Sequence, residues 1–369
     1  MKKQVTIKDV ARRAGASVGT VSNLLNGLPC GAELREKINS AIRELHYVPN
    51  MHAKAVRSSR TNCIGLLVEG DAEDNYPWLQ SEIAEFIAVA AESGYRAMLE
   101  YWDNSSEKLP QLLNCVDGLI TRGHFTEKFC RILEQNGNIP LVTHAEPLFY
   151  ANELNVLSNS LPGMSEALEY LLGLGHRNIG YVGDLSTPFL AVKAENFLSA
   201  WKNKGFDYDR AFMENTRSYE GTPADAGFAA TEALLARKGH LLTALLYDSD
   251  CHAIGGLGAL QKCRKSIPAD CSVISFDDST WASSVRPALT SIAPDVSLMS
   301  LEVHCLIRKL KAEDPSSAPF ETPPCVPYRL VIRESTASPP PFPDGPDESP
   351  SPQGSVPAGT TRNVQKKQP

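Results

Sequence analysis

The chain has 369 residues, of which 42% are hydrophobic and 21% are charged, a composition typical of a globular protein. It is too long for one small domain and long enough to bury a sizeable core. No run approaches roughly 18 uninterrupted apolar residues, and residues 1–13 lack the apolar stretch of a signal peptide. We therefore expect no membrane span and no export. The nine cysteines are scattered without a CxxC pair or a histidine cluster, which favours reduced thiols over disulfides or a metal site.

The net charge of −7 hides a strong asymmetry along the chain. Residues 1–60 contain 11 Lys and Arg against 4 Asp and Glu, a net of +7, and the remainder contains 25 against 39, a net of −14. A basic segment of this size suits contact with phosphates, and the acidic remainder does not. The alternative is a solvated helical surface, but the positive excess coincides with a motif that also indicates DNA binding.

That motif lies in residues 6–50, which are predicted to form three short helices with a tight turn between the first two. Thr6 and Asp9 can form a reciprocal cap, and apolar residues recur after Thr6 at helical spacing. Gly15 ends the first helix, and Ser17 is a suitable cap for the second. The outer face of the second helix is short, polar and free of acids, and consists of Ser17, Gly19, Thr20, Ser22, Asn23 and Asn26. Such a face can approach base edges in a DNA major groove, so the pattern predicts a helix-turn-helix.

Residues 50–61 follow as a linker. Asn50 can cap a helix there, but the segment is too short to be helical on its own in water. We expect it to become ordered only when something holds it.

From Cys63 onward, short apolar runs alternate with amphipathic helical segments. The predicted strands are 64–68, 95–101, 116–121, 140–144, 178–183, 242–247 and 271–276. Several predicted helices end in glycine, at Gly94, Gly175 and Gly205. This alternation predicts parallel sheets in two doubly wound lobes, with a ligand cleft at the carboxyl ends of the strands. The last residues, 336–369, are rich in Pro, Ser and Gly and are predicted to be disordered.

The segments TIKDVARRAG, SVGTVSNLLNG, REKINSAIRELHYVPN, SVISFDDS, RPALTSIAP and RLVIREST resemble the LacI-type family of bacterial transcription regulators. The resemblance covers roughly residues 4–335. It implies a helix-turn-helix domain at 1–49, a hinge-helix linker at 50–61, a two-lobed α/β sensor like a periplasmic binding protein at 62–335, and the tail at 336–369. It also implies a homodimer, or a dimer of dimers, on a palindromic operator in double-stranded DNA. A proline-rich tail cannot supply the helical heptads of a tetramer, so the dimer is favoured.

The same resemblance implies roles for residues of the head and linker. The implied DNA-binding residues are Thr6, Ser17, Val18, Gly19, Thr20, Ser22, Asn23, Asn26, Tyr47, Asn50, Ala53 and Val56. Ser17 and Thr20 would hold phosphates, and Asn23 stands where the family often has arginine. Asparagine can pair with adenine through two hydrogen bonds, so the operator should differ from one read by arginine. Val56 matches a leucine that the family wedges into the minor groove, and the alternative is a plain spacer.

For the sensor, the resemblance implies an effector pocket that contains Trp78, Lys193, Ser249 and Asp277. Asp277 could accept hydroxyl hydrogen bonds from a sugar, with the Lys193 cation opposite it. Trp78 could stack on a sugar or belong to the core. The enzymatic alternative to ligand binding is that Asp277 and Asp278 form a catalytic pair of carboxylates.

Three other classes of protein are alternatives to an effector-controlled regulator: an enzyme, an exported sugar-binding protein and a regulator without an effector. No GxGxxG after a strand, GxxxxGK[ST], GxSxG or HExxH motif is present, so we expect no enzyme and no cofactor. The glycines at 255–258 lie on a predicted helix and indicate packing. An exported sugar-binding protein is disfavoured by the basic head, and a regulator without any effector remains open. Our prediction is a cytoplasmic, nucleoid-associated repressor whose effector shifts the population of lobe and linker arrangements.

Overall fold

The computed structural model describes residues 5–25, 28–48, 60–69, 77–102, 108–123, 127–136, 139–145, 154–186, 188–312 and 325–341. The head consists of α1 (Ile7–Ala14), α2 (Val18–Leu25) and α3 (Ala32–Glu44). Its small core is formed by Val10, Ala11, Ala14, Val21, Ile38, Ala41 and Tyr47. The predicted cap of α1 is present, since the backbone N–H and the hydroxyl of Thr6 both donate to Asp9 Oδ2. Gly15 ends α1 at φ 63°, as its position predicted.

The body is built on eleven strands in the order β2-β1-β3-β4-β5-β11-β10-β9-β8-β6-β7. The strands of the first lobe are β1 (Cys63–Glu69), β2 (Arg96–Trp102), β3 (Gly118–Arg122), β4 (Leu141–Ala145) and β5 (Leu154–Asn159). Those of the second lobe are β6 (Ile179–Gly183), β7 (Met213–Asn215), β8 (Ala244–Tyr247), β9 (Ser272–Phe276) and β10 (Thr290–Pro294). Within each lobe all pairings are parallel, and both lobes repeat the same strand order. This is the predicted doubly wound arrangement, with its switch points between β1 and β3 and between β6 and β8.

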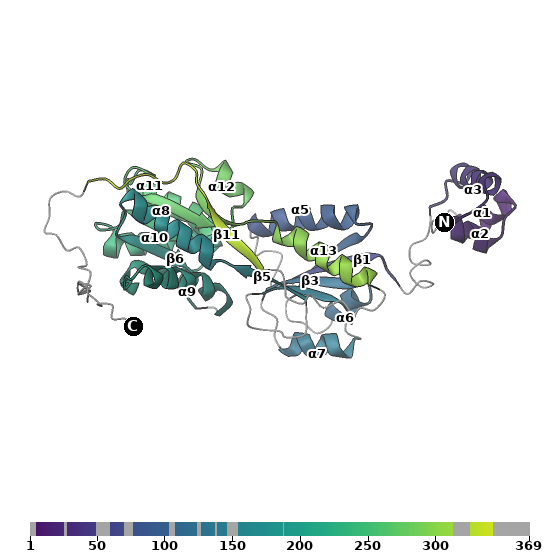
Figure 1. Ribbon diagram of the computed structural model, residues 1–369, viewed down its shortest axis with the longest axis horizontal. Helices are drawn as coiled ribbons and strands as arrows, with labels where there is room; N and C mark the ends of the chain where they lie inside the picture. The colour runs from purple at the N-terminus through teal and green to yellow at the C-terminus, as the bar shows by residue number, and fades with distance from the viewer. Residues whose placement is uncertain are drawn as a thin grey trace, which may run out of the picture.

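Helices cover both faces of each sheet (Figure 1). In the first lobe, α5 (Pro77–Glu92) and α13 (Leu298–Lys311) pack on one face, and α6 (Lys108–Leu113) and α7 (Glu127–Gln135) pack on the other. In the second lobe, α8 (Leu161–Leu174) and α9 (Pro188–Asn203) lie opposite α10 (Pro223–Lys238), α11 (Asp250–Lys262) and α12 (Thr280–Ser284). Helices α10 and α11 approach closely at Gly227 and Gly255, where a Cβ atom would collide with the backbone of the other helix. The glycines at 255–258 therefore serve packing at Gly255, as the sequence predicted.

Strand β11 (Cys325–Val331) belongs to both lobes. Its first residues pair parallel with β5, and its last residues pair antiparallel with β10. The described chain also crosses between the lobes at Ser160, between β5 and α8, and at 295–297, between β10 and α13. Tyr328, in the middle of β11, packs against the cores of both lobes. The lobes are thus joined by three crossings, where a hinge between them would act.

All seven predicted strands are present, with ends that differ by a few residues, and β5, β7, β10 and β11 were not predicted. The predicted boundary of the tail at residue 336 is too early. The backbone N–H of Ala337 donates to Ser272 Oγ, its carbonyl accepts from Ser272 Oγ at 3.0 Å and lies 2.8 Å from His176 Nε2, and the Thr336 hydroxyl lies 3.0 Å from that of Tyr170. These bonds attach the chain to the second lobe at least as far as Ala337.

Within the described residues, no helix is long and apolar enough to cross a bilayer, and no cluster of His, Cys, Asp and Glu is arranged to hold a metal ion. Eight of the nine cysteines have side chains that the structure describes, and these eight are free thiols.

A buried ion-pair network joins three elements of the first lobe. Arg122, at the carboxyl end of β3, contacts Glu302 of α13 at 2.6 Å and Glu82 of α5 at 2.7 Å. Burial of the Arg122 guanidinium opposes its charge, but the two carboxylates outweigh this effect and raise its pKa. The network fixes α5 and α13 to the sheet beneath them.

Replacing Glu302 with alanine removes one partner of this network and leaves a buried guanidinium with Glu82 alone. We expect the free energy of unfolding of the first lobe to fall by about 3 kcal/mol, since an incompletely compensated buried charge is costly. Urea unfolding followed by the fluorescence of the buried Trp102 measures the change. Glu169→Ala breaks only the exposed pair with Lys204 and should cost less than about 1 kcal/mol. Equal losses in the two variants would contradict the assignment.

Candidate nucleic-acid interface and ligand cleft

Helix α2 presents one face to the core of the head and the other to solvent. Val21 is fully buried, whereas Ser17, Gly19 and Asn23 are exposed and Thr20 and Ser22 are half-buried. The helix contains no acidic residue. The exposed face can therefore offer hydrogen-bond donors and acceptors without repelling phosphate.

The amino end of α2 is organised by the Ser17 hydroxyl. Its Oγ accepts from the backbone N–H of Thr20 at 3.0 Å and lies 2.8 Å from Thr20 Oγ1. This confirms the predicted cap. The remaining amide N–H groups of the first turn point along the positive end of the helix dipole, which attracts anions such as phosphate.

Gly19 occupies open space on the same face. A Cβ atom built there would meet only Ser17 Oγ, at an ordinary contact distance of 3.6 Å. Glycine inside a helix costs roughly 0.5–1 kcal/mol relative to alanine. No contact in the described part of the head requires this cost, so Gly19 leaves room for a partner to approach the helix closely.

The other predicted DNA-binding residues divide into three groups. Thr6 is exposed but uses its hydroxyl to cap α1. Val18 is half-buried against the core, and Tyr47 is 9% exposed within it, so the Tyr47 ring mainly packs the head. The predicted residues Asn26, Asn50, Ala53 and Val56 lie outside the described residues.

The residues predicted to form a ligand cleft in the body lie where the strands of the second lobe end. Lys193, on α9, reaches this edge and donates from Nζ to the Asp248 carbonyl oxygen at 2.8 Å and to Asp277 Oδ1 at 3.0 Å. The ammonium also lies over the Phe276 ring, 4.0 Å from its centroid. The side chains of Lys193 and Asp277 are 22% and 23% exposed, so a ligand can reach both. Two of the four predicted effector residues are therefore in direct contact.

The other two predicted residues have different outcomes. Ser249 caps α11, with its hydroxyl accepting from the backbone N–H of His252, which explains a serine there without a ligand. Trp78 belongs to α5, and its side chain lies outside the described part of the chain.

Two further acids at this edge were missed by the sequence analysis. Asp248 Oδ1 lies 2.5 Å from His252 Nδ1, and Asp184 Oδ2 lies 2.7 Å from Arg217 Nε. Burial opposes the charge on Asp248, but His252 and Lys193 outweigh it and lower the pKa of the carboxyl. Both acids directly follow a predicted strand, and this signal could have identified them.

The two acids after β9 act separately. Asp278 pairs with Arg333 at 2.6 Å, whereas Asp277 pairs with Lys193. Both backbones have positive φ, 98° at Asp277 and 52° at Asp278, a conformation that non-glycine residues rarely adopt. Because each carboxylate contacts a different cation, the two acids do not form one paired site, and the catalytic-dyad alternative loses its basis.

Asp250 stabilises the strained turn at Asp277 and Asp278 through hydrogen bonds to the residues around it. It is buried, and its carboxylate accepts from the hydroxyls of Ser275 and Ser291 and from the backbone N–H of Ser279. Burial and the nearby Asp277 charge raise the pKa of Asp250 to about 6.

This raised pKa predicts a specific pH dependence. The unfolded carboxyl titrates near 3.8 and the folded one near 6, so folding favours the neutral acid. Stability that is present below pH 3.8 is therefore lost as the pH rises towards 6, by an amount of roughly 3 kcal/mol. We expect wild type to lose stability relative to Asp250→Asn across this window, measured by urea unfolding at a series of pH values. A constant difference between the two proteins would contradict the assignment.

Known proteins resemble this chain over both its parts. Residues 6–50 match the family model of bacterial regulatory proteins of the lacI family, and residues 168–336 match a periplasmic binding protein-like domain. The HTH-type transcriptional repressor PurR of Escherichia fergusonii, a regulator rather than an enzyme, is 31% identical over 91% of this chain and 98% of its own length. A solved complex of the transcriptional regulator CelR with cellobiose aligns with a TM-score of 0.62 and 25% identity, over 90% of this chain and 100% of that one. The lac repressor dimer bound to operator and the anti-inducer ONPF aligns with a TM-score of 0.72 and 23% identity, over 91% of this chain and 100% of that one. The chain belongs to the LacI family of bacterial regulatory proteins.

Proposed function

We propose that the protein is a transcriptional repressor that binds a palindromic operator as a homodimer and is controlled by a sugar or sugar derivative. The observation that carries this proposal is the exposed, polar and acid-free face of α2 on a basic head. The protein would act on DNA in the cytoplasm, at the nucleoid.

Recognition of the operator would rest on three features of α2. The hydroxyls of Ser17 and Thr20 and the amino end of the helix would contact phosphates, which fix the position of the head. The missing side chain at Gly19 would allow the backbone to approach the bases. Asn23 would then read an adenine through two hydrogen bonds.

Apolar side chains on the body support a dimer. Ile87 on α5 is 52% exposed and Trp281 on α12 is 45% exposed, and these two helices contact one another. Val296, at a crossing between the lobes, is 53% exposed. Large apolar side chains that lie exposed on adjacent elements are typical of a protein–protein interface. Two copies joined by this face would present two heads to a two-fold symmetric site.

The cleft supports a hydroxyl-rich effector. A sugar hydroxyl can donate to Asp277 in place of the Lys193 ammonium, and the ammonium can then donate to another hydroxyl of the same ligand. Lys193 lies over Phe276, and Phe276 packs on Tyr328 with ring centroids 5.0 Å apart. Since Tyr328 contacts both cores at a crossing, a ligand that moves Lys193 would act on the hinge. The effector would thereby shift the balance between lobe arrangements that do and do not favour operator binding.

One observation favours a second candidate, a regulator without an effector. Lys193 and Asp277 already neutralise one another, and Ser249 is engaged as a helix cap. Such a cleft would need no ligand for its charges to be satisfied.

The DNA-reading role of Asn23 can be tested on an operator selected from random duplexes by the full-length protein. We expect Asn23→Ala to weaken binding to that operator by about 1–3 kcal/mol and to relax selectivity at one base pair of each half-site. Binding to random duplex should be unaffected, because it rests on phosphates. Asn203→Ala, an exposed asparagine at the end of α9, is the matched control. An unchanged base preference in the Asn23 variant would contradict the assignment.

The effector can be sought by thermal unfolding in the presence of cellobiose, glucose, ribose and their phosphates. A true effector at about 100 times its Kd should add about 2.7 kcal/mol of stability. Asp277→Asn should abolish the shift while tolerating the positive φ, which asparagine adopts more easily than most residues. Asp207→Asn, at an exposed position, should keep the shift. If no compound shifts the transition, the effector-free candidate is favoured.

A further inference from the structure

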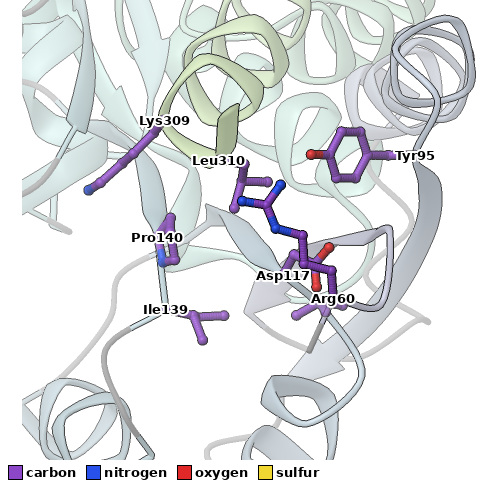
Figure 2. A pocket seen from close by; sticks show the side chains of 8 residues that line it. Arg60, Tyr95, Asp117, Ile139, Pro140, Lys309 and Leu310 are labelled. Atoms are coloured by element: carbon purple, nitrogen blue, oxygen red, sulfur yellow. The ribbon is translucent and has the colours of Figure 1, made fainter. Parts of the chain in front are cut away.

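A cavity lies at the edge of the first-lobe sheet that is opposite the predicted effector cleft (Figure 2). Its volume is about 260 Å³. Tyr95, Asp117 and Pro140 line it, and each directly precedes a strand, namely β2, β3 and β4. Because these strands are parallel, their amino ends share one edge of the sheet, and the effector cleft is predicted at the carboxyl edge. Arg60 and the last turn of α13 complete the wall.

The same edge is where the linker joins the body. The carboxylate of Asp117 accepts three hydrogen bonds from the last residue of the linker, Thr61, and from Asn62, which follows it. Thr61 donates its backbone N–H at 2.6 Å and its hydroxyl at 2.9 Å, and Asn62 donates its backbone N–H at 2.8 Å. Asp117 therefore fixes the root of the linker to the sheet, and it forms part of the cavity wall while doing so.

The cavity combines an apolar floor with an excess of positive charge. Val116, Ile139 and Leu310 supply apolar surface, while Arg60 and Lys309 carry two positive charges against the one negative charge of Asp117. In Figure 2 the Arg60 guanidinium points toward Leu310, on the side of the cavity where the Tyr95 hydroxyl lies. Burial and Asp117 raise the pKa of Tyr95 and Arg60 lowers it, which agrees with this placement and keeps the hydroxyl a donor at neutral pH.

These groups favour an organic anion over a sugar. A guanidinium has five N–H donors in a planar fork, so Arg60 can bind a carboxylate through two parallel bonds in addition to its other contacts. Asp117 already accepts three bonds from the linker root and has little capacity for hydroxyl donors. An apolar floor next to a cationic fork suits a flat hydrocarbon body that carries a carboxylate.

We propose that this cavity is a second ligand site, which binds a small organic carboxylate with an apolar body and acts on DNA binding through the linker root. The carboxylate contacts the Arg60 guanidinium and the Tyr95 hydroxyl, and the apolar body rests on Val116 and Leu310. Arg60 directly precedes Thr61, so a ligand that holds Arg60 also restrains the end of the linker. This site is independent of the effector cleft that we propose in the second lobe.

Benzoate and its uncharged counterpart benzamide test the proposal in calorimetric titrations of the full-length protein. Benzoate should bind with a Kd of about 1 mM or tighter, and benzamide at least about tenfold more weakly. Arg60→Gln should weaken benzoate binding at least tenfold, and Arg264→Gln, an exposed arginine of the second lobe, should leave it unchanged. Saturating benzoate should change the affinity for the selected operator several-fold, and operator should change the affinity for benzoate by the same factor.

Several results would overturn the proposal. Benzoate that fails to bind at millimolar concentrations, or that binds no better than benzamide, removes the anion site. Binding that survives Arg60→Gln places the probe elsewhere. Binding that is lost in Asp277→Asn places the probe in the effector cleft. Benzoate that binds at Arg60 without changing operator affinity leaves a ligand site but removes its link to DNA binding.

Discussion

The two lobes of the body depend on a strand that belongs to both. Strand β11 leaves the sheet of the first lobe after Pro327 and enters that of the second at Tyr328. A proline lacks the N–H that a central strand needs, so its position at the change of partner is physically appropriate. Tyr328 then packs on both cores and on Phe276, whose ring lies beneath the Lys193 ammonium. A change in the contacts of Lys193 would therefore alter the packing of Phe276 and Tyr328, where the lobes join.

The head follows a different principle, in which small residues are kept where larger ones would stabilise it. The caps at Thr6 and Ser17 and the left-handed Gly15 define the ends of two eight-residue helices with very little core between them. In such a small domain Gly19 lowers the stability of α2, and no contact among the described residues requires a glycine there. A position that lowers stability without an internal reason is best explained by what approaches it from outside.

The sequence was informative where one physical rule decides the structure. Apolar runs bounded by turn residues predicted seven buried strands, and capping residues predicted the ends of α1 and α2. Three of the four strands that it did not predict lack that signal, because β7 is only three residues long, β10 ends in proline, and β11 alternates and contains Pro327. For the cleft, Asp277 and Lys193 were predicted through a resemblance, and their direct contact was not. The contacts that Phe276, Asp248 and His252 make at this edge were not predicted, because the edge is assembled from strand ends that are far apart in the sequence. Ser249 stays a prediction, since its hydroxyl already caps α11 and a serine before a helix needs no ligand to explain it.

The sheet pairings and the buried ion pairs of Arg122 connect the first lobe across its whole width, and this would let the lobe carry the proposed signal. Strand β1 begins at Cys63, next to the linker root that Asp117 holds, and ends at Glu69 on the cleft edge, roughly 20 Å away. Arg122 ties α5 and α13 to the sheet beside it through buried ion pairs. Such a layer resists internal deformation, so motion about the crossings near Tyr328 displaces both of its edges together. A ligand between the lobes would then move the linker root without any local change at Asp117. A ligand at Arg60 would act on that root directly, which is why the two sites need no shared pathway of side chains to influence the same DNA-binding head.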